Sequence, residues 1–319
     1  MKSLVEFGSL PEEALLIACS SHEERCKAVP LAWRDWRPST VALFHYDDPN
    51  PRREKNHSWL TTEFSRECRV LEIPFSEKDP AGSFWSNAEL FRGLAAEATS
   101  RAVVLDITVF TKRHLLMTLQ WLHDLGSDPL LLYTEPEDYD VSEHIPLSFG
   151  LSSVEEIPGF AASPDASRPL QVVLFLGYEG DRVLATYERL QPVDTILFVP
   201  DPAFRERWQG KSEIFNKDLI AMVGQERTLG ADGIDPEAVA SVLRHELGPE
   251  EERSQFCRMI CPLGTKPQAV GAYLYARRCV DPPALIYTSP LRHNHDFFSH
   301  GIRKTWMLEI DPEPSPPSR

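Results

Sequence analysis

The chain has 319 residues, of which 42% are hydrophobic and 25% are charged, a composition typical of a folded protein with room for two domains. Its formal net charge of -15 disfavours an extended nucleic-acid surface, although a local pocket can still hold a small anion. No apolar run approaches the roughly 18 residues of a membrane span, residues 1–10 lack a secretory signal, and the cysteines follow no disulfide pattern. We therefore expect a cytoplasmic protein without membrane contacts.

Strands and helices are predicted to alternate through the first half of the chain. Apolar runs predict strands at residues 13–19, 41–44, 70–73, 102–106 and 130–133. Helices are predicted at 23–36, 86–98 and 112–125, and a loop at 46–58, where the sequence is polar and contains two prolines. This alternation is typical of a parallel sheet with helices on both faces.

The same order begins again after a predicted linker at residues 158–169. Strands are predicted at 172–176, 196–199, 256–261 and 284–287, and helices are predicted to end near 190 and to span 236–247 and 267–278. We expect one domain at residues 1–157, a second at 170–310, and a disordered proline-rich tail at 311–319.

A constant spacing relates the two halves. Several residues recur 154 positions later: Pro38 at Pro192, Leu43-Phe44 at Leu197-Phe198, Asp47 at Asp201, Thr111-Lys112 at Thr265-Lys266, Tyr133-Thr134 at Tyr287-Thr288, and Pro136 at Pro290. Near the start the spacing is 157, from Arg25 to Arg182. We infer a tandem duplication: an α/β protein of two Rossmann-like units with mainly parallel sheets. The alternative is two unrelated units with chance matches.

Duplicated units can pack about a pseudo-two-fold axis, as the subunits of a homodimer do. Ligands of open parallel sheets bind beyond the carboxyl ends of the strands. The sequence therefore predicts a ligand cleft between equivalent loops of the two halves.

The turn Gly264-Thr265-Lys266-Pro267 follows a predicted strand and begins a predicted helix. Glycine permits close approach of the backbone, threonine can cap the helix, and lysine adds a positive charge beside the helix N-terminus. This chemistry suits an anion, although the turn lacks the spacing of a Walker A loop. Thr111-Lys112 is the counterpart in the first half. The alternative is a capped helix with a solvated lysine.

This Gly-Thr-Lys turn resembles one found in CARF domains, the Rossmann-like sensors of cyclic oligonucleotides in prokaryotic defence. The resemblance covers the α/β pattern of each half, with Gly264-Thr265-Lys266 as its specific motif. It implies that the turn lines a nucleotide pocket and that the protein acts in antiviral defence. No effector domain of the kinds that accompany many CARF domains is evident in the sequence, so a protein partner is expected to supply the output.

The loops after the first strand of each half supply further ligand-binding candidates. Ser20, Ser21 and Arg25 lie in the first half, and Tyr178 and Arg182 in the second. A tyrosine ring can stack on a base, and arginine can pair with phosphate. The alternative is an N-capping serine with arginines that pair with neighbouring carboxylates.

Three carboxylates are candidates for acid–base catalysis, namely Asp106, Glu23 and Glu24. Asp106 ends a predicted strand, where a carboxylate can act as a general base or bind a ribose hydroxyl. The second half has Ile260 in its place, so a catalytic site would be asymmetric. The alternative is that Asp106 caps the following turn.

His293, His295 and His300 lie near Asp296, but their spacing fits no standard zinc pattern, so we predict a polar loop and no metal site. Cys257 and Cys261 are expected in the core. The sequence contains neither Gly-x-Gly-x-x-Gly nor Gly-x-Ser-x-Gly, and no cofactor is predicted.

Three functions stay open at this stage. The preferred hypothesis is a module that senses a nucleotide or another phosphorylated small molecule. A nucleotide-processing hydrolase, either a phosphodiesterase or an N-glycoside hydrolase, is the first alternative. The second is an acidic scaffold that recruits a protein partner. Whether the protein turns over a substrate is not decided by the sequence.

Overall fold

The computed structural model describes residues 3–4, 9–33, 36–47, 49–139, 148–162, 167–248, 255–293, 299–308 and 310. The chain divides into two compact units. Within the described residues, the first unit comprises the chain up to 139 together with 299–310, and the second comprises 148–293. No helix in these ranges is long and apolar enough to cross a membrane.

The first unit is built on a sheet in the order β1-β17-β6-β5-β2-β3-β4. Its strands are β1 (Ser3–Leu4), β2 (Leu15–Cys19), β3 (Thr40–Tyr46), β4 (Arg69–Phe75), β5 (Val103–Asp106), β6 (Leu130–Thr134) and β17 (Thr305–Leu308). Strands β2 to β6 run parallel, whereas β17 and β1 are antiparallel additions. A separate short pair joins β7 (Asp138–Tyr139) to β16 (Ser299–His300).

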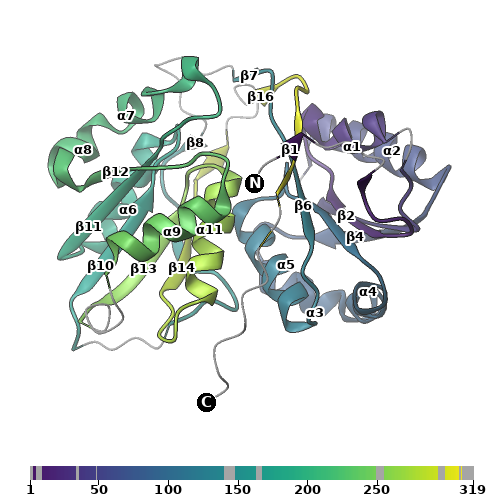
Figure 1. Ribbon diagram of the computed structural model, residues 1–319, viewed down its shortest axis with the longest axis horizontal. Helices are drawn as coiled ribbons and strands as arrows, with labels where there is room; N and C mark the ends of the chain where they lie inside the picture. Colours follow the sequence, from purple (N-terminus) through teal and green to yellow (C-terminus); the bar gives the residue numbers. More distant parts are fainter. Residues whose placement is uncertain are drawn as a thin grey trace. The chain divides into compact units, whose positions relative to one another are not determined.

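Helices cover both faces of this sheet (Figure 1). They are η2 (Glu24–Lys27), α1 (Ala28–Ala32), α2 (Pro51–Ser65), α3 (Pro80–Ser86), α4 (Ala88–Ser100) and α5 (Lys112–Asp124). On the α1–α2 face Trp33 packs against Phe64, and on the α4–α5 face Phe44 and Trp121 both contact Phe91. The central strands are fully buried between these two layers.

The second unit has a sheet in the order β12-β11-β10-β13-β14-β9. The strands are β9 (Ser153–Glu156), β10 (Leu170–Phe175), β11 (Asp194–Pro200), β12 (Thr228–Ala231), β13 (Cys257–Pro262) and β14 (Ala284–Ser289). The helices are α6 (Gly180–Leu190), η3 (Glu206–Trp208), α7 (Lys211–Phe215), α8 (Lys217–Val223), η4 (Gln225–Arg227), α9 (Pro236–Glu246) and α11 (Lys266–Arg277). Cys261 lies in the core, as expected, and Cys257 is half-buried. Short strands β8 (Ser148–Phe149) and β15 (Arg292–His293) pair beside this sheet.

Both units share one topology, which supports the prediction of two tandem Rossmann-like units. Numbered within each unit, the parallel strands follow the order 3-2-1-4-5, and an antiparallel sixth strand lies beside strand 5. Each unit takes its sixth strand from the segment that follows the parallel strands of the other unit in sequence. Strand β9 follows the five parallel strands of the first unit but pairs with β14 of the second, whereas β17 follows those of the second unit but pairs with β6 of the first.

This exchange places the unit boundaries differently from the predicted domains 1–157 and 170–310. Residues 148–156 belong to the second unit and residues 299–308 to the first. Their backbone hydrogen bonds go to distant strands, which hydrophobic periodicity does not identify. The predicted tail at 311–319 lies outside the described residues.

The loop predicted at residues 46–58 is wrong, because helix α2 begins at Pro51. The side chain of Asn50 accepts hydrogen bonds from the backbone N–H groups of Arg52 (3.0 Å) and Arg53 (3.2 Å). Proline suits the first helical position, since its missing N–H would have no partner there. Asn50-Pro51 is thus a helix start, and the polar composition reflects the outer face of α2.

Candidate functional site

The order of the strands defines one special position in each sheet. In the first unit the direction of strand addition reverses between β2 and β5, and in the second it reverses between β10 and β13. Loops diverge at such a switch point and leave a crevice at the carboxyl ends of the strands. In each unit the predicted ligand-binding residues lie at this point: Ser20, Ser21, Arg25, Thr111 and Lys112 in the first, and Tyr178, Arg182, Gly264, Thr265 and Lys266 in the second.

Helices α5 and α11 begin in the same way at these two positions. Thr111 and Thr265 are the N-caps, and half-buried Lys112 and Lys266 are the first helical residues. Neither helix has an acidic residue in its first turn. The other helices of eight or more described residues, α2, α4, α6 and α9, all have one. The positive ends of α5 and α11 are therefore not offset by a carboxylate of their own first turn.

The hydroxyl of each capping threonine is engaged within its own unit. Thr265 Oγ1 donates to the carbonyl oxygen of Gly233 (2.7 Å) and accepts from the Gln268 N–H (3.2 Å). Thr111 Oγ1 accepts from the His114 N–H (3.4 Å) and lies 2.6 Å from His114 Nδ1. These threonines consequently fix the helix starts. In α11 the capping box uses the Thr265 and Gln268 N–H groups, and Pro267 has none. The lysines and the positive helix ends are therefore the candidate ligand contacts.

Two glycines bring the switch-point loops of the second unit into close contact. A Cβ added at Gly177 would lie 2.9 Å from the carbonyl oxygen of Leu263, and one at Gly264 would lie 2.1 Å from Gln268 Oε1. Gln268 Oε1 in turn accepts from the Thr265 N–H (2.9 Å), which completes a capping box. A side chain at Gly264 would therefore displace the Gln268 amide from this capping box.

The two arginines matched by sequence spacing occupy equivalent places. Arg25 and Arg182 are each 3% exposed. Arg25 pairs with Glu23 (2.6 Å), donates to the Thr134 carbonyl (2.9 Å) and interacts with Tyr133. Arg182 pairs with Glu179 and interacts with Tyr287. In both units the arginine thus ties the first loop to the end of strand 5.

Burial lowers the pKa of Arg182, whereas Glu23 and Tyr133 outweigh burial at Arg25 and raise its pKa above the ordinary value. The Arg25 guanidinium is committed to these internal contacts, so a direct ligand contact there would require displacing a carboxylate. Arg182 is only partly committed, because its Nε and Nη1 are buried without a hydrogen-bond partner among the described residues.

The remaining loop residues are largely internal. Ser20 is fully buried, and its hydroxyl has no hydrogen-bond partner among the described residues. Ser21 Oγ accepts from the Glu23 N–H (3.3 Å). The Tyr178 ring packs at 5.5 Å from that of Phe215.

Two of the three carboxylates considered for catalysis have structural contacts. Asp106 is 2% exposed and accepts from the Thr108 N–H (3.0 Å) and hydroxyl. The Thr108 hydroxyl also accepts from the Thr134 N–H (3.0 Å). Asp106 thus caps the turn after β5, as the alternative interpretation held. Glu23 pairs with Arg25 and accepts a hydrogen bond from the Ser299 hydroxyl. Glu24 is exposed.

Sequence reasoning missed two buried arginines at the same end of the first sheet. Arg53 and Arg113 lie in the first turns of α2 and α5 and are 6% and 5% exposed. Arg53 pairs with Glu77 (3.7 Å), and Arg113 donates to the Glu77 carbonyl (2.5 Å). Burial raises the pKa of Glu77, while both arginines oppose this shift. Arg53 lies in the segment predicted as a loop, so there was no reason to expect it in a helix. No sequence pattern indicates that Arg113 is buried.

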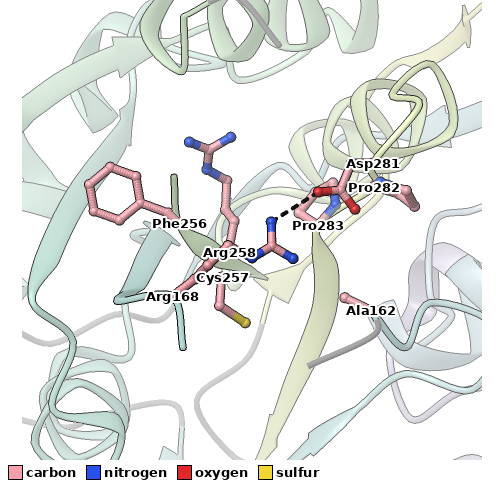
Figure 2. Close-up of a pocket in the computed structure, with 8 residues that line it drawn as sticks. All are labelled: Ala162, Arg168, Phe256, Cys257, Arg258, Asp281, Pro282 and Pro283. Carbon is pink, nitrogen blue, oxygen red and sulfur yellow. Dashed lines mark hydrogen bonds and ion pairs between the residues drawn. The ribbon is translucent and has the colours of Figure 1, made fainter. Parts of the chain in front are cut away.

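The second unit also has a pocket at the opposite end of its sheet (Figure 2). Its lining includes Phe256, Cys257 and Arg258 at the start of β13 and Pro283 just before β14. An ion pair between Arg168 and Asp281 (3.2 Å) lies across it. It contains none of the predicted site residues. Of the histidines considered for a metal, His293 is in β15 and His300 in β16, while His295 and Asp296 fall outside the described residues.

No family model matches the chain, and no curated protein matches it. Among solved structures, it is similar to a protein assigned to the universal stress proteins from Pseudomonas aeruginosa UCBPP-PA14 (8% identity, 89% of this chain and 95% of that chain, TM-score 0.25). Another is a functionally unknown protein from Pseudomonas aeruginosa PAO1 (9% identity, 89% and 94%, TM-score 0.25). A third is a universal stress protein from Archaeoglobus fulgidus DSM 4304 (7% identity, 88% and 97%, TM-score 0.24). Similarity this low identifies no function.

Proposed function

We propose that the protein binds a nucleotide or another phosphorylated small molecule at the carboxyl ends of its parallel strands. One observation carries the proposal. At the switch point of both units, a helix begins with a threonine cap and a lysine and has no acidic residue in its first turn. Helix N-termini bind phosphate through free backbone N–H groups and the helix dipole, and an adjacent lysine adds a point charge.

Unit 1 offers the more cationic surroundings for such a ligand. Arg53 and Arg113 flank Glu77 at the ends of β3 and β4, beside the start of α5. In the second unit the equivalent helix start has Lys266 and the closely packed glycines. We therefore expect unequal affinities, with the first unit preferring the more highly charged phosphate.

The resemblance of Gly264-Thr265-Lys266 to CARF domains leads us to favour a nucleotide over other phosphorylated molecules. In this proposal the protein is a sensor, and a protein partner supplies the response. None of the carboxylate contacts described above favours hydrolysis over binding.

The proposal is tested by isothermal calorimetry with mono-, di- and cyclic oligonucleotides on the wild type, Lys112→Ala and Lys266→Ala. Loss of a lysine–phosphate contact is expected to weaken binding about tenfold, equivalent to roughly 1.4 kcal/mol. Lys217→Ala is the matched control, because Lys217 also begins a helix, α8, but has Asp218 beside it in the first turn.

Binding that is weakened by Lys112→Ala or Lys266→Ala but not by Lys217→Ala supports the proposal. Equal affinity in all four proteins would place the ligand elsewhere. Absence of binding to every nucleotide, from folded protein, would overturn the proposal and favour an acidic scaffold.

A further inference from the structure

Two histidines and a glutamate converge on the α1–α2 face of the first sheet. His45 lies on β3, Glu72 on the neighbouring strand β4, and His57 on α2. One ligand atom from each residue lies within 4.8 Å of the others. In the described part of the chain, no other group of three or more histidine, cysteine or acidic side chains has this geometry.

The sheet and helix define the position of each side chain. Phe44 and Tyr46 contact Phe91 and His114 on the α4–α5 side, so the intervening His45 points to the other face. There its ring centroid lies 4.5 Å from that of His57, at an interplanar angle of 38°. The three residues lie on two strands and a helix, so their backbone positions are set by regular secondary structure.

Two of the three side chains already form a hydrogen bond between an imidazole nitrogen and a carboxylate oxygen, and a metal ion bound to both atoms would take the place of the shared proton. His57 Nε2 lies 2.8 Å from Glu72 Oε2. His57 Nδ1 is buried and has no hydrogen-bond partner among the described residues.

We propose that His45, His57 and Glu72 form a binding site for a divalent transition metal ion, with Zn²⁺ as the favoured ion. Two imidazoles and one carboxylate are a common zinc ligand set, and three protein ligands leave a further position for water. The side chain of Glu72 is 48% exposed, so the site opens to solvent and the ion has an entry path. Two ligand atoms each about 2.0–2.2 Å from zinc lie at most about 4.4 Å apart. Zinc binding therefore requires the 2.8 Å His57–Glu72 contact to widen and the widest pair of ligand atoms, up to 4.8 Å apart, to close slightly.

The test measures Zn²⁺ affinity and stoichiometry on metal-free protein, by chelator competition and elemental analysis. We expect one strongly bound ion in the wild type. In His57→Ala and in Glu72→Gln we expect affinity to fall by about 100-fold or more, beyond the typical effect of losing an outer hydrogen-bond partner. Glu72→Gln keeps the size and exposure of the side chain, so it tests the charge of the ligand without endangering the fold.

His245→Ala is the matched control. His245 Nδ1 lies 2.9 Å from Glu246 Oε1, a histidine–glutamate pair that belongs to no three-residue cluster in the described chain. This variant should bind Zn²⁺ like the wild type. Co²⁺ absorption distinguishes the site from the six free cysteines, because nitrogen and oxygen ligands give no thiolate-to-metal charge-transfer band.

Unchanged affinity in both His57→Ala and Glu72→Gln would overturn the proposal, as would a thiolate band or the absence of bound metal in the wild type. The outcome is independent of the nucleotide experiment, since neither Lys112 nor Lys266 is part of this cluster.

Discussion

At the scale of single residues, burial separates the candidate side chains. The sequence marks Arg25, Arg182 and Asp106 as ligand or catalytic candidates, and all three are buried and make internal hydrogen bonds or ion pairs. Lys112 and Lys266 keep half-buried positions at helix starts. The ligand-binding proposal therefore depends on the lysines and on the positive ends of their helices.

His114 provides a pH-dependent prediction at this scale. Burial, followed by repulsion from Arg113, lowers the pKa of His114 to about 3, against a smaller effect of the Ser76 carbonyl. An unfolded chain takes up this proton near pH 6.5, so it binds more protons than the folded protein does between these values. The free energy of unfolding should fall as the pH decreases below about 6.5, by up to roughly 1.4 kcal/mol per pH unit from this group.

His114→Gln removes this titration while keeping a polar side chain. Urea unfolding at pH 7 and pH 5 should show a smaller loss of stability in the variant than in the wild type. Identical losses in the two proteins would contradict a depressed pKa at His114.

At the scale of elements, helix starts determine where the candidate sites lie. Helix α2 carries both Arg53 and His57, and its start depends on Asn50. Asn50→Ala should lower the free energy of unfolding by about 1 kcal/mol, because two backbone N–H groups lose their acceptor. It should also weaken Zn²⁺ binding, since the position of His57 depends on the helix.

Asn50→Asp is the control for this prediction, because aspartate retains the accepting oxygen and caps helices equally well. Chemical denaturation and zinc titration check both effects. Equal stability of Asn50→Ala and the wild type would show that α2 does not depend on this cap.

At the scale of the whole molecule, the exchanged sixth strands make each unit depend on a distant part of the chain. Strand β17 covers β6, and its segment supplies two donors to Glu135, which is 1% exposed. Arg303 Nη1 lies 2.8 Å from Glu135 Oε2, and Trp306 Nε1 lies 2.6 Å from Oε1. Deleting residues 299–319 should destabilise the first unit by roughly 3–5 kcal/mol or more, because β1 and β6 lose the strand with which they pair and Glu135 loses both donors.

Hydrogen exchange should then show lost protection in β5 and β6, while β10 to β14 of the second unit keep theirs. Deleting only residues 311–319 is the control and should leave both units protected. Loss of protection in both units after the longer deletion would mean that the two do not unfold separately.

The sequence by itself determined the parallel strands and the repeated order of elements, because burial on both faces of a sheet leaves continuous apolar runs and a duplication leaves constant spacing. Only the tertiary structure decided the strand order, which places the switch point, and which strand completes each sheet, since these pairings join segments far apart in sequence. The His45, His57 and Glu72 cluster was likewise hidden, because its members come from three elements at no characteristic spacing. The partners of the buried arginines are also decided by tertiary packing, and no local sequence pattern predicts them.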